Sequence, residues 1–65
     1  MNIEPIAKIA MEFLKDNVSG VNLCGVESIG EIYEVEWETR FGEGRGSVFV
    51  TVEQLRIVGF KRLKQ

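Results

Sequence analysis

The sequence has no histidine, one cysteine and one proline. Histidine is the commonest general base and metal ligand near neutral pH, so its absence removes most catalytic templates. The lone cysteine, Cys24, cannot form an internal disulfide, which favours a reducing cytoplasm over a disulfide-stapled exported domain. Cys24 also lacks a histidine, a second cysteine or a cationic neighbour in the sequence. We therefore predict that it is a small buried hydrophobe, not a nucleophile or zinc ligand.

Long apolar runs are also missing. A membrane span needs about 20 consecutive apolar residues, and no stretch of the chain approaches that length. Charges interrupt the apolar residues of the first segment, MNIEPIAKIAMEF, where a signal peptide needs an uncharged core. We expect a cytoplasmic protein with no membrane partner. The formal net charge of -2 gives no reason to expect a general nucleic-acid binder.

The chain of 65 residues can form one small domain, 1–65, with a single compact core. Its first part, 2–17, is predicted to be an amphipathic helix. Pro5 fits the first turn, and we expect Asn2 or Glu4 at or near the N-cap. The polar face mixes both charge signs, which favours core packing over membrane binding. The apolar face recurs at intervals of three and four: Ile6, Ile9, Ala10, Phe13 and Leu14.

After Gly20 an alternating pattern predicts strands. The first covers 21–29, with a bulge or bend near Gly25. The clearest covers 32–40, with the charged residues, Arg40 among them, on one face and Tyr33, Val35, Trp37 and Thr39 on the other. Segment 47–53 resumes the alternation, with Val48, Val50 and Val52 on one face. In the final strand, 57–63, we expect Val58 and Phe60 on one side and Ile57 and Leu63 on the other.

Glycine-rich segments are expected to join the strands. Gly30 and Glu31 fit a tight turn, and the cluster GEGRG at 42–46 fits a hairpin loop. This cluster lacks the Gly-Lys-Ser/Thr ending of a phosphate-binding loop and precedes a strand, not a helix. Segment 53–56 is predicted to be the last turn, and the alternative is a helix over 52–58.

Together these elements predict an α+β fold, in which one N-terminal helix packs on a three- to four-stranded antiparallel β-meander. Trp37 shares a face with Tyr33 and Val35, so we predict that it belongs to the core and not to a binding site.

Two charged segments are candidates for function. The glutamates of strand 32–40, with Glu27 and Glu31 nearby, could bind a hard cation, but residues two apart on a strand lie about 7 Å apart. We favour a solvated sheet face, paired with Arg or Lys of a neighbouring strand. We predict no metal site, no cofactor and no catalytic residue. The acidic residues of the strand itself are Glu34, Glu36 and Glu38.

The other charged segment is RIVGFKRLKQ, where basic residues surround Phe60. A basic strand with an aromatic can contact phosphates and stack a base. The acidic strand would repel a polyanion unless the two charges lie on separate faces. We favour an edge strand protected from aggregation by its charges, and do not expect nucleic acid as the partner. The basic residues are Arg56, Lys61, Arg62 and Lys64.

The first strand has fewer charged residues that would discourage pairing with another chain, because only Asn22 and Glu27 flank its apolar residues. In a meander it is an edge strand, whose unpaired backbone groups can template pairing with another chain. We predict that a homodimer forms there or that a partner protein adds a strand there. The residues of this candidate edge are Val21, Leu23 and Val26.

The order of a helix, GVESIGEIYEVEWE, SVFVTVE, a turn and IVGFKRLK resembles the helix-plus-meander pattern of PepSY-type and cystatin-like small domains. It is similar, more loosely, to the gas vesicle protein O family, in which a Val-rich segment, an acidic strand around Tyr or Trp, and a closing Gly-aromatic-basic strand recur. The short hairpin GEGRG departs from the gas vesicle pattern, and the absence of an export or membrane signal departs from the PepSY setting. No functional residue is carried over from either.

These observations predict a non-enzymatic interaction or accessory domain that presents a sheet face or edge to an unidentified protein partner. The alternative is a small nucleic-acid-binding module that uses the basic C-terminal strand. A third hypothesis is a carboxylate-based enzyme or cation site on the acidic strand.

Overall fold

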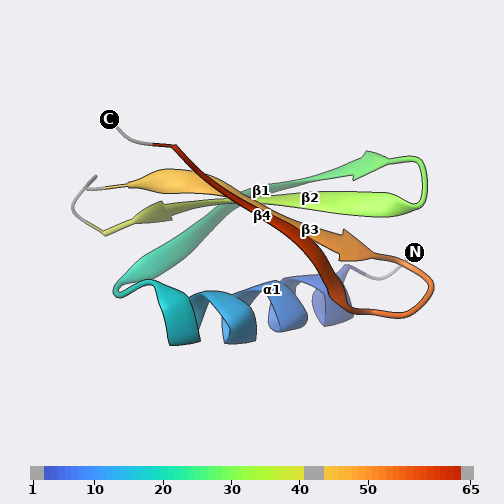
Figure 1. Cartoon of the computed structure of the whole chain (residues 1–65), viewed down its shortest axis with the longest axis horizontal. Coiled ribbons are helices and arrows are strands. Elements are labelled where there is room, and N and C mark those ends of the chain that lie inside the picture. Colours follow the sequence, from blue (N-terminus) through green and yellow to red (C-terminus); the bar gives the residue numbers. More distant parts are fainter. Residues whose placement is uncertain (1–2, 41–43, 64–65) are drawn as a thin grey trace.

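A computed structural model describes residues 3–40 and 44–63 of the chain. Figure 1 shows one helix lying across a face of a twisted four-stranded sheet. This confirms the predicted α+β fold, with four strands in the meander. The elements in order are α1 (Glu4–Asn17), β1 (Val21–Ile29), β2 (Ile32–Thr39), β3 (Arg45–Thr51) and β4 (Ile57–Leu63).

Helix α1 forms where the apolar spacing predicts it. Ile3 occupies the N-cap position without a side-chain hydrogen bond, and Glu4 and Pro5 follow in the first turn. Asn2, the other predicted cap, lies outside the described residues. At the end of α1 the Asn17 side-chain amide donates to the Phe13 carbonyl at 2.8 Å. In the described part of the chain, no helix has the length and apolar character needed to cross a membrane.

The strands pair in the order β1-β2-β3-β4, each antiparallel to the next. A shift in the β1–β2 register between Leu23 and Gly25 leaves Cys24 without a paired residue. This confirms the predicted bulge near Gly25. Gly30, with φ of 62°, lies in the tight turn between β1 and β2, a backbone conformation that glycine adopts without strain.

The predicted glycine loop at 42–46 is shorter than expected, because Arg45 and Gly46 belong to β3. Gly46 pairs with Trp37 on one side and with Arg62 on the other. A Cβ atom on Gly46 would overlap the Lys61 carbonyl oxygen, so this position needs glycine for close strand approach. Residues 42 and 43 of the predicted loop lie outside the described residues.

The connection from β3 to β4 is a turn over 52–54, and the alternative helix over 52–58 does not form. The alternation predicted that this strand continues through Val52, but β3 ends at Thr51. Leu55 has φ of 51°, a left-handed conformation that is uncommon for residues other than glycine. The Leu55 amide donates to the Thr51 carbonyl at 3.0 Å, which closes the turn.

The core lies between α1 and the sheet face turned toward it, here called the inner face. Trp37 is 1% exposed, which confirms its prediction as a core residue. Ile9 and Phe13 of α1 are partly buried against this core. The buried hydrophobic residues are Ile6, Ala10, Leu14, Val18, Val35, Trp37, Val48 and Val50.

The prediction that Ile57 and Phe60 lie on opposite sides of β4 is wrong. A register shift opposite Phe49 and Val50 leaves Val58 without a paired residue. Ile57 pairs with Val50 and Phe60 pairs with Val48, so both lie on the inner face. The irregularity changes the alternation, because one extra residue reverses the face of every residue that follows it.

Candidate functional site

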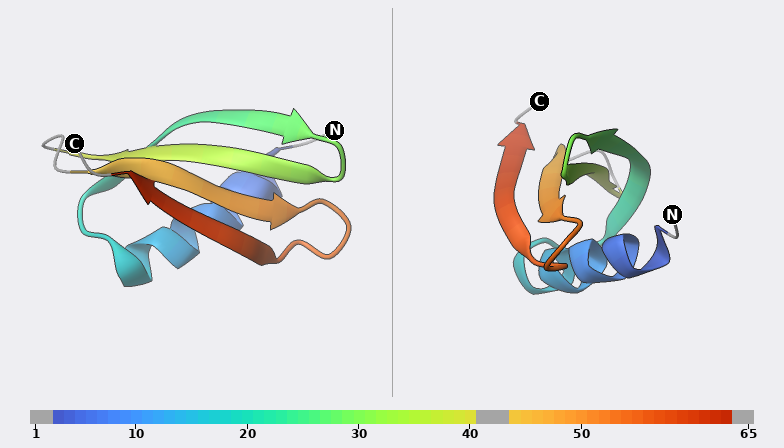
Figure 2. Two further views of the ribbon diagram at one scale, coloured as in Figure 1. Left: turned by 45° about the horizontal axis from the view of Figure 1, so that its top comes forward. Right: turned by 90° about the vertical axis from the view of Figure 1, so that its right-hand side faces the viewer.

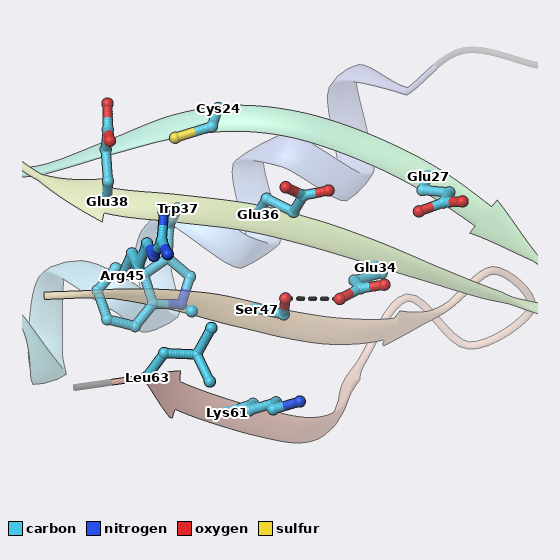
Figure 3. Close-up of a pocket in the computed structure, with 11 residues that line it drawn as sticks. Cys24, Glu27, Glu34, Glu36, Trp37, Glu38, Arg45, Ser47, Lys61 and Leu63 are labelled. Carbon is cyan, nitrogen blue, oxygen red and sulfur yellow. Dashed lines mark hydrogen bonds between the residues drawn. The ribbon is translucent and has the colours of Figure 1, made fainter. Parts of the chain in front are cut away.

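The sheet face turned away from α1, here called the outer face, carries a shallow hollow (Figure 3). The glutamates of β2 lie along its middle, as the alternation predicts. Residues of all four strands line the hollow, and they include Cys24, Glu27, Arg45, Ser47, Lys61 and Leu63. Acidic side chains of β1 and β2 therefore share one surface with basic side chains of β3 and β4.

A hydrogen bond joins one of these glutamates to β3. The Ser47 hydroxyl donates to Glu34 Oε2 at 2.6 Å, and Ser47 is only 7% exposed. Arg45 lies opposite Glu38 in the β2–β3 register. Glu36 and Glu38 are exposed to solvent. The arrangement agrees with a solvated sheet face that has a basic residue on a neighbouring strand.

A cation site finds no support in this arrangement. Among residues 3–40 and 44–63, no group of three or more acidic, cysteine or histidine side chains is placed to hold a metal ion. Glu27 and Glu34 lie directly opposite each other in the β1–β2 register. Two like charges so placed repel each other, and Ser47 stabilises one of them with a hydrogen bond.

Cys24 is exposed, so the prediction of a buried hydrophobe is wrong. The bulge at this position turns its side chain toward the outer face, where it lines the hollow. Desolvation by its surroundings raises the pKa of the Cys24 thiol, and the carboxylates of Glu38 and Glu36 raise that pKa further. The thiol is thus held in its protonated form, which is the less nucleophilic one.

The candidate edge on the first strand has the expected place but a different surface. β1 is an outer strand of the sheet, with β2 as its neighbour. Its residues Val21, Leu23 and Val26 are partly buried and pack against the core under α1. These three side chains are therefore turned toward the core and not toward the open side of the strand.

The opposite edge, β4, exposes apolar side chains. Val58 is 49% exposed, Phe60 41% and Leu63 42%. In Figure 2 the strand forms the border of the sheet opposite β1. β4 therefore combines an open backbone edge with apolar side chains that solvent reaches.

Phe60 belongs to an aromatic cluster that sequence reasoning missed. Its ring stacks nearly parallel on Trp37, with centroids 5.8 Å apart, and is tilted against Phe13 at 5.4 Å. Such pairs contribute stability beyond the area they bury. The alternation alone could not place Phe60 beside Trp37, because that contact requires the irregular pairing at Val58.

The predicted basic surface is divided by the fold. Lys61 lines the outer-face hollow, whereas Arg62 pairs with Gly46 and the guanidinium lies near Gly44. Arg56 lies before β4, at the end opposite Arg62, and donates to the Gln54 side chain at 3.4 Å. Lys64 lies outside the described residues. These three described residues do not form one continuous patch.

Comparison of the chain with protein-family models, curated proteins and solved structures gives no match. The resemblances to PepSY-type, cystatin-like and gas vesicle protein O patterns therefore stay untested.

Proposed function

We propose that the chain is a non-enzymatic interaction module that offers a sheet edge to a strand of a partner protein. The observation that carries the proposal is the open edge of β4, where Val58, Phe60 and Leu63 are each more than two-fifths exposed. An edge strand supplies backbone donors and acceptors for strand addition, and apolar side chains beside it supply burial.

The residue inventory supports a role without catalysis. There is no histidine in the sequence, and the raised pKa of Cys24 disfavours its thiolate. The single cysteine also supports a cytoplasmic setting for this role, since it cannot form an internal disulfide.

The alternative, a nucleic-acid-binding module, has less support. A phosphate backbone is bound by basic residues that follow one surface. Here Lys61 shares its face with Glu34 and Glu36, and Arg56 and Arg62 lie toward opposite ends of β4. A polyanion that contacts Lys61 would therefore approach these carboxylates.

Capture from a lysate of the native source tests the proposal when edge variants are included. We expect wild-type protein to retain a partner that is lost from Val58→Lys on β4 or from Ile29→Lys on β1. Both side chains are about half exposed, 49% and 51%, so neither variant disturbs the core. A lysine on an edge strand discourages strand pairing.

Sedimentation equilibrium addresses a second copy of the chain as the partner. A concentration-dependent dimer that Ile29→Lys abolishes would support pairing through β1, the edge that the sequence favours. The interaction proposal fails if the wild-type protein is monomeric and both lysine variants retain the same captured proteins as wild type.

A further inference from the structure

We propose that the β4 edge takes a partner segment in which apolar and acidic residues alternate, added as a fifth strand. This inference rests on the proposed function and assigns it both an edge and a ligand chemistry. Three observations carry it: an unfinished row of apolar side chains on the inner face, a basic end to a row on the outer face, and the charge of β4 itself.

The apolar row crosses all four strands on the inner face. In register it runs Val26, Val35, Val48, Phe60. Val35 and Val48 are fully buried, whereas Phe60, at the border, is 41% exposed. An apolar side chain on a fifth strand would lie beside Phe60 and continue the row, which removes apolar surface from water.

The neighbouring row lies on the outer face and ends with a positive charge. In register it runs Gly25, Glu36, Ser47, Lys61. The neutral Ser47 separates Lys61 from Glu36, and the Ser47 hydroxyl is engaged with Glu34. On a fifth strand, the residue next to the apolar one points to this face, where a carboxylate would lie opposite Lys61.

The charge of β4 selects an acidic partner over a basic one. Ile57–Leu63 contains Lys61 and Arg62 and no acidic residue. Its first half, Ile57–Phe60, has no charge that would discourage pairing. A partner strand with glutamates would gain cross-strand attraction at this edge, and one with lysines would be repelled.

Two synthetic peptides test the inference directly: eight residues alternating valine with glutamate, and eight alternating valine with lysine. Each is titrated into uniformly ¹⁵N-labelled full chain while the backbone amide resonances are followed by NMR. We expect the glutamate peptide to shift the amides of Ile57–Leu63 and to leave those of Val21–Ile29 in place. Strand addition also slows hydrogen exchange of the outward amides of β4.

Charge and edge variants sharpen the result. Lys61→Glu is expected to weaken binding of the glutamate peptide about fivefold, as one cross-strand charge pair allows, and to improve binding of the lysine peptide. Val58→Glu, which adds a charge of the same sign as the peptide, should abolish the β4 shifts, and Ile29→Glu, the matched control on β1, should leave them unchanged. Added salt should weaken glutamate-peptide binding.

Three results of the peptide titrations overturn the inference. They are shifts confined to β1, equal affinity for the two peptides, and no β4 shift at millimolar peptide. If a captured protein is lost from Ile29→Glu but not from Val58→Glu, the proposed function stands and only this inference fails. Binding of a single-stranded oligothymidylate to β4 in place of the glutamate peptide also overturns it, and favours the nucleic-acid alternative.

Discussion

The two edges of the sheet differ in how the single helix covers them. On β1, Leu23 and Val26 are packed against the core, whereas on β4 Val58 and Phe60 remain about half exposed. Helix α1 contacts β1 more extensively than β4, and a short link joins it to β1. A single helix cannot bury a whole four-stranded sheet. Three apolar side chains of β4 stay exposed, whereas on β1 the exposed one is Ile29, at the end of the strand.

Trp37→Ala is expected to have the largest effect, because Trp37 is the largest of the fully buried side chains in the described part of the chain. Trp37 is 1% exposed and supports Phe60 by stacking. Removing a buried tryptophan costs about 3 to 5 kcal/mol, which is comparable with the whole stability of a small domain. Loss of the dispersed amide spectrum and of the cooperative thermal transition would confirm this.

The matched control is Trp37→Phe, which keeps an aromatic ring against Phe60. The indole Nε1 of Trp37 is buried without a hydrogen-bond partner in the described structure, so this variant also removes an unsatisfied donor. It should remain folded. If Trp37→Ala also remains folded with native-like chemical shifts, the assignment of the inner face is wrong.

Gly46→Ala is expected to separate β4 from the sheet and to leave the pairing of β1 with β2 intact. Its Cβ would overlap backbone atoms of Lys61, which cannot move away as a flexible side chain can. Overpacking of this kind costs about 1 to 3 kcal/mol. Gly25→Ala on β1 is the control, because a Cβ there meets nothing within 4 Å. Denaturant unfolding should place Gly46→Ala well below Gly25→Ala, and equal stabilities would contradict the close strand contact.

Truncation of one apolar side chain on each edge strand measures how much that side chain contributes to the free energy of unfolding. Leu23→Ala removes a side chain packed on the core and should cost about 1 to 2 kcal/mol, less than for a fully buried leucine. Val58→Ala, at 49% exposure, should change the free energy of unfolding by about 0.5 kcal/mol or less. Urea titrations of both variants give these values, and a larger loss for Val58→Ala would reverse the comparison.

The smallest expected effect concerns the Cys24 thiol on the outer face. Its pKa is raised by desolvation and by the carboxylates of Glu38 and Glu36, so the thiolate fraction at pH 8 is reduced. The rate of alkylation by iodoacetamide should therefore be lower than for a cysteine in a short peptide. Glu38→Gln removes one of these charges and should raise the rate modestly. An unchanged rate would mean that Glu38 does not act on the thiol.

The raised pKa also sets a direction for stability. Because the folded state holds the Cys24 proton more tightly than the unfolded state, this contribution to stability is complete below the unfolded pKa. It is lost as the pH rises through the folded value. Cys24→Ser should therefore show a smaller loss of stability at alkaline pH than wild type.

Local patterns predicted the helix, the strands and the core position of Trp37 because each depends on the period of neighbouring residues. The spacing of Ile6, Ala10 and Leu14 identifies the buried side of α1, and the alternation around Val35 identifies the inner face of β2. The bulge near Gly25 was also predictable, since the alternation fails there.

Features that depend on pairing between strands were not predictable. The irregularity at Val58 appears only in the β3–β4 register, and it determines that Phe60 reaches Trp37. Exposure of Cys24 likewise follows from its position in the bulge, not from its residue type. The exposure of apolar side chains at each edge depends on how far α1 covers the sheet. No local sequence pattern contains that information.

A spin-labelled peptide tests most directly the claim that β4, and not β1, receives a partner strand. A nitroxide at one end of the valine–glutamate peptide broadens the amide resonances of residues near it in the complex. We predict that amides of Ile57–Leu63 lose intensity and that those of Val21–Ile29 do not. Broadening along β1, or equal broadening over both edges, would contradict the account.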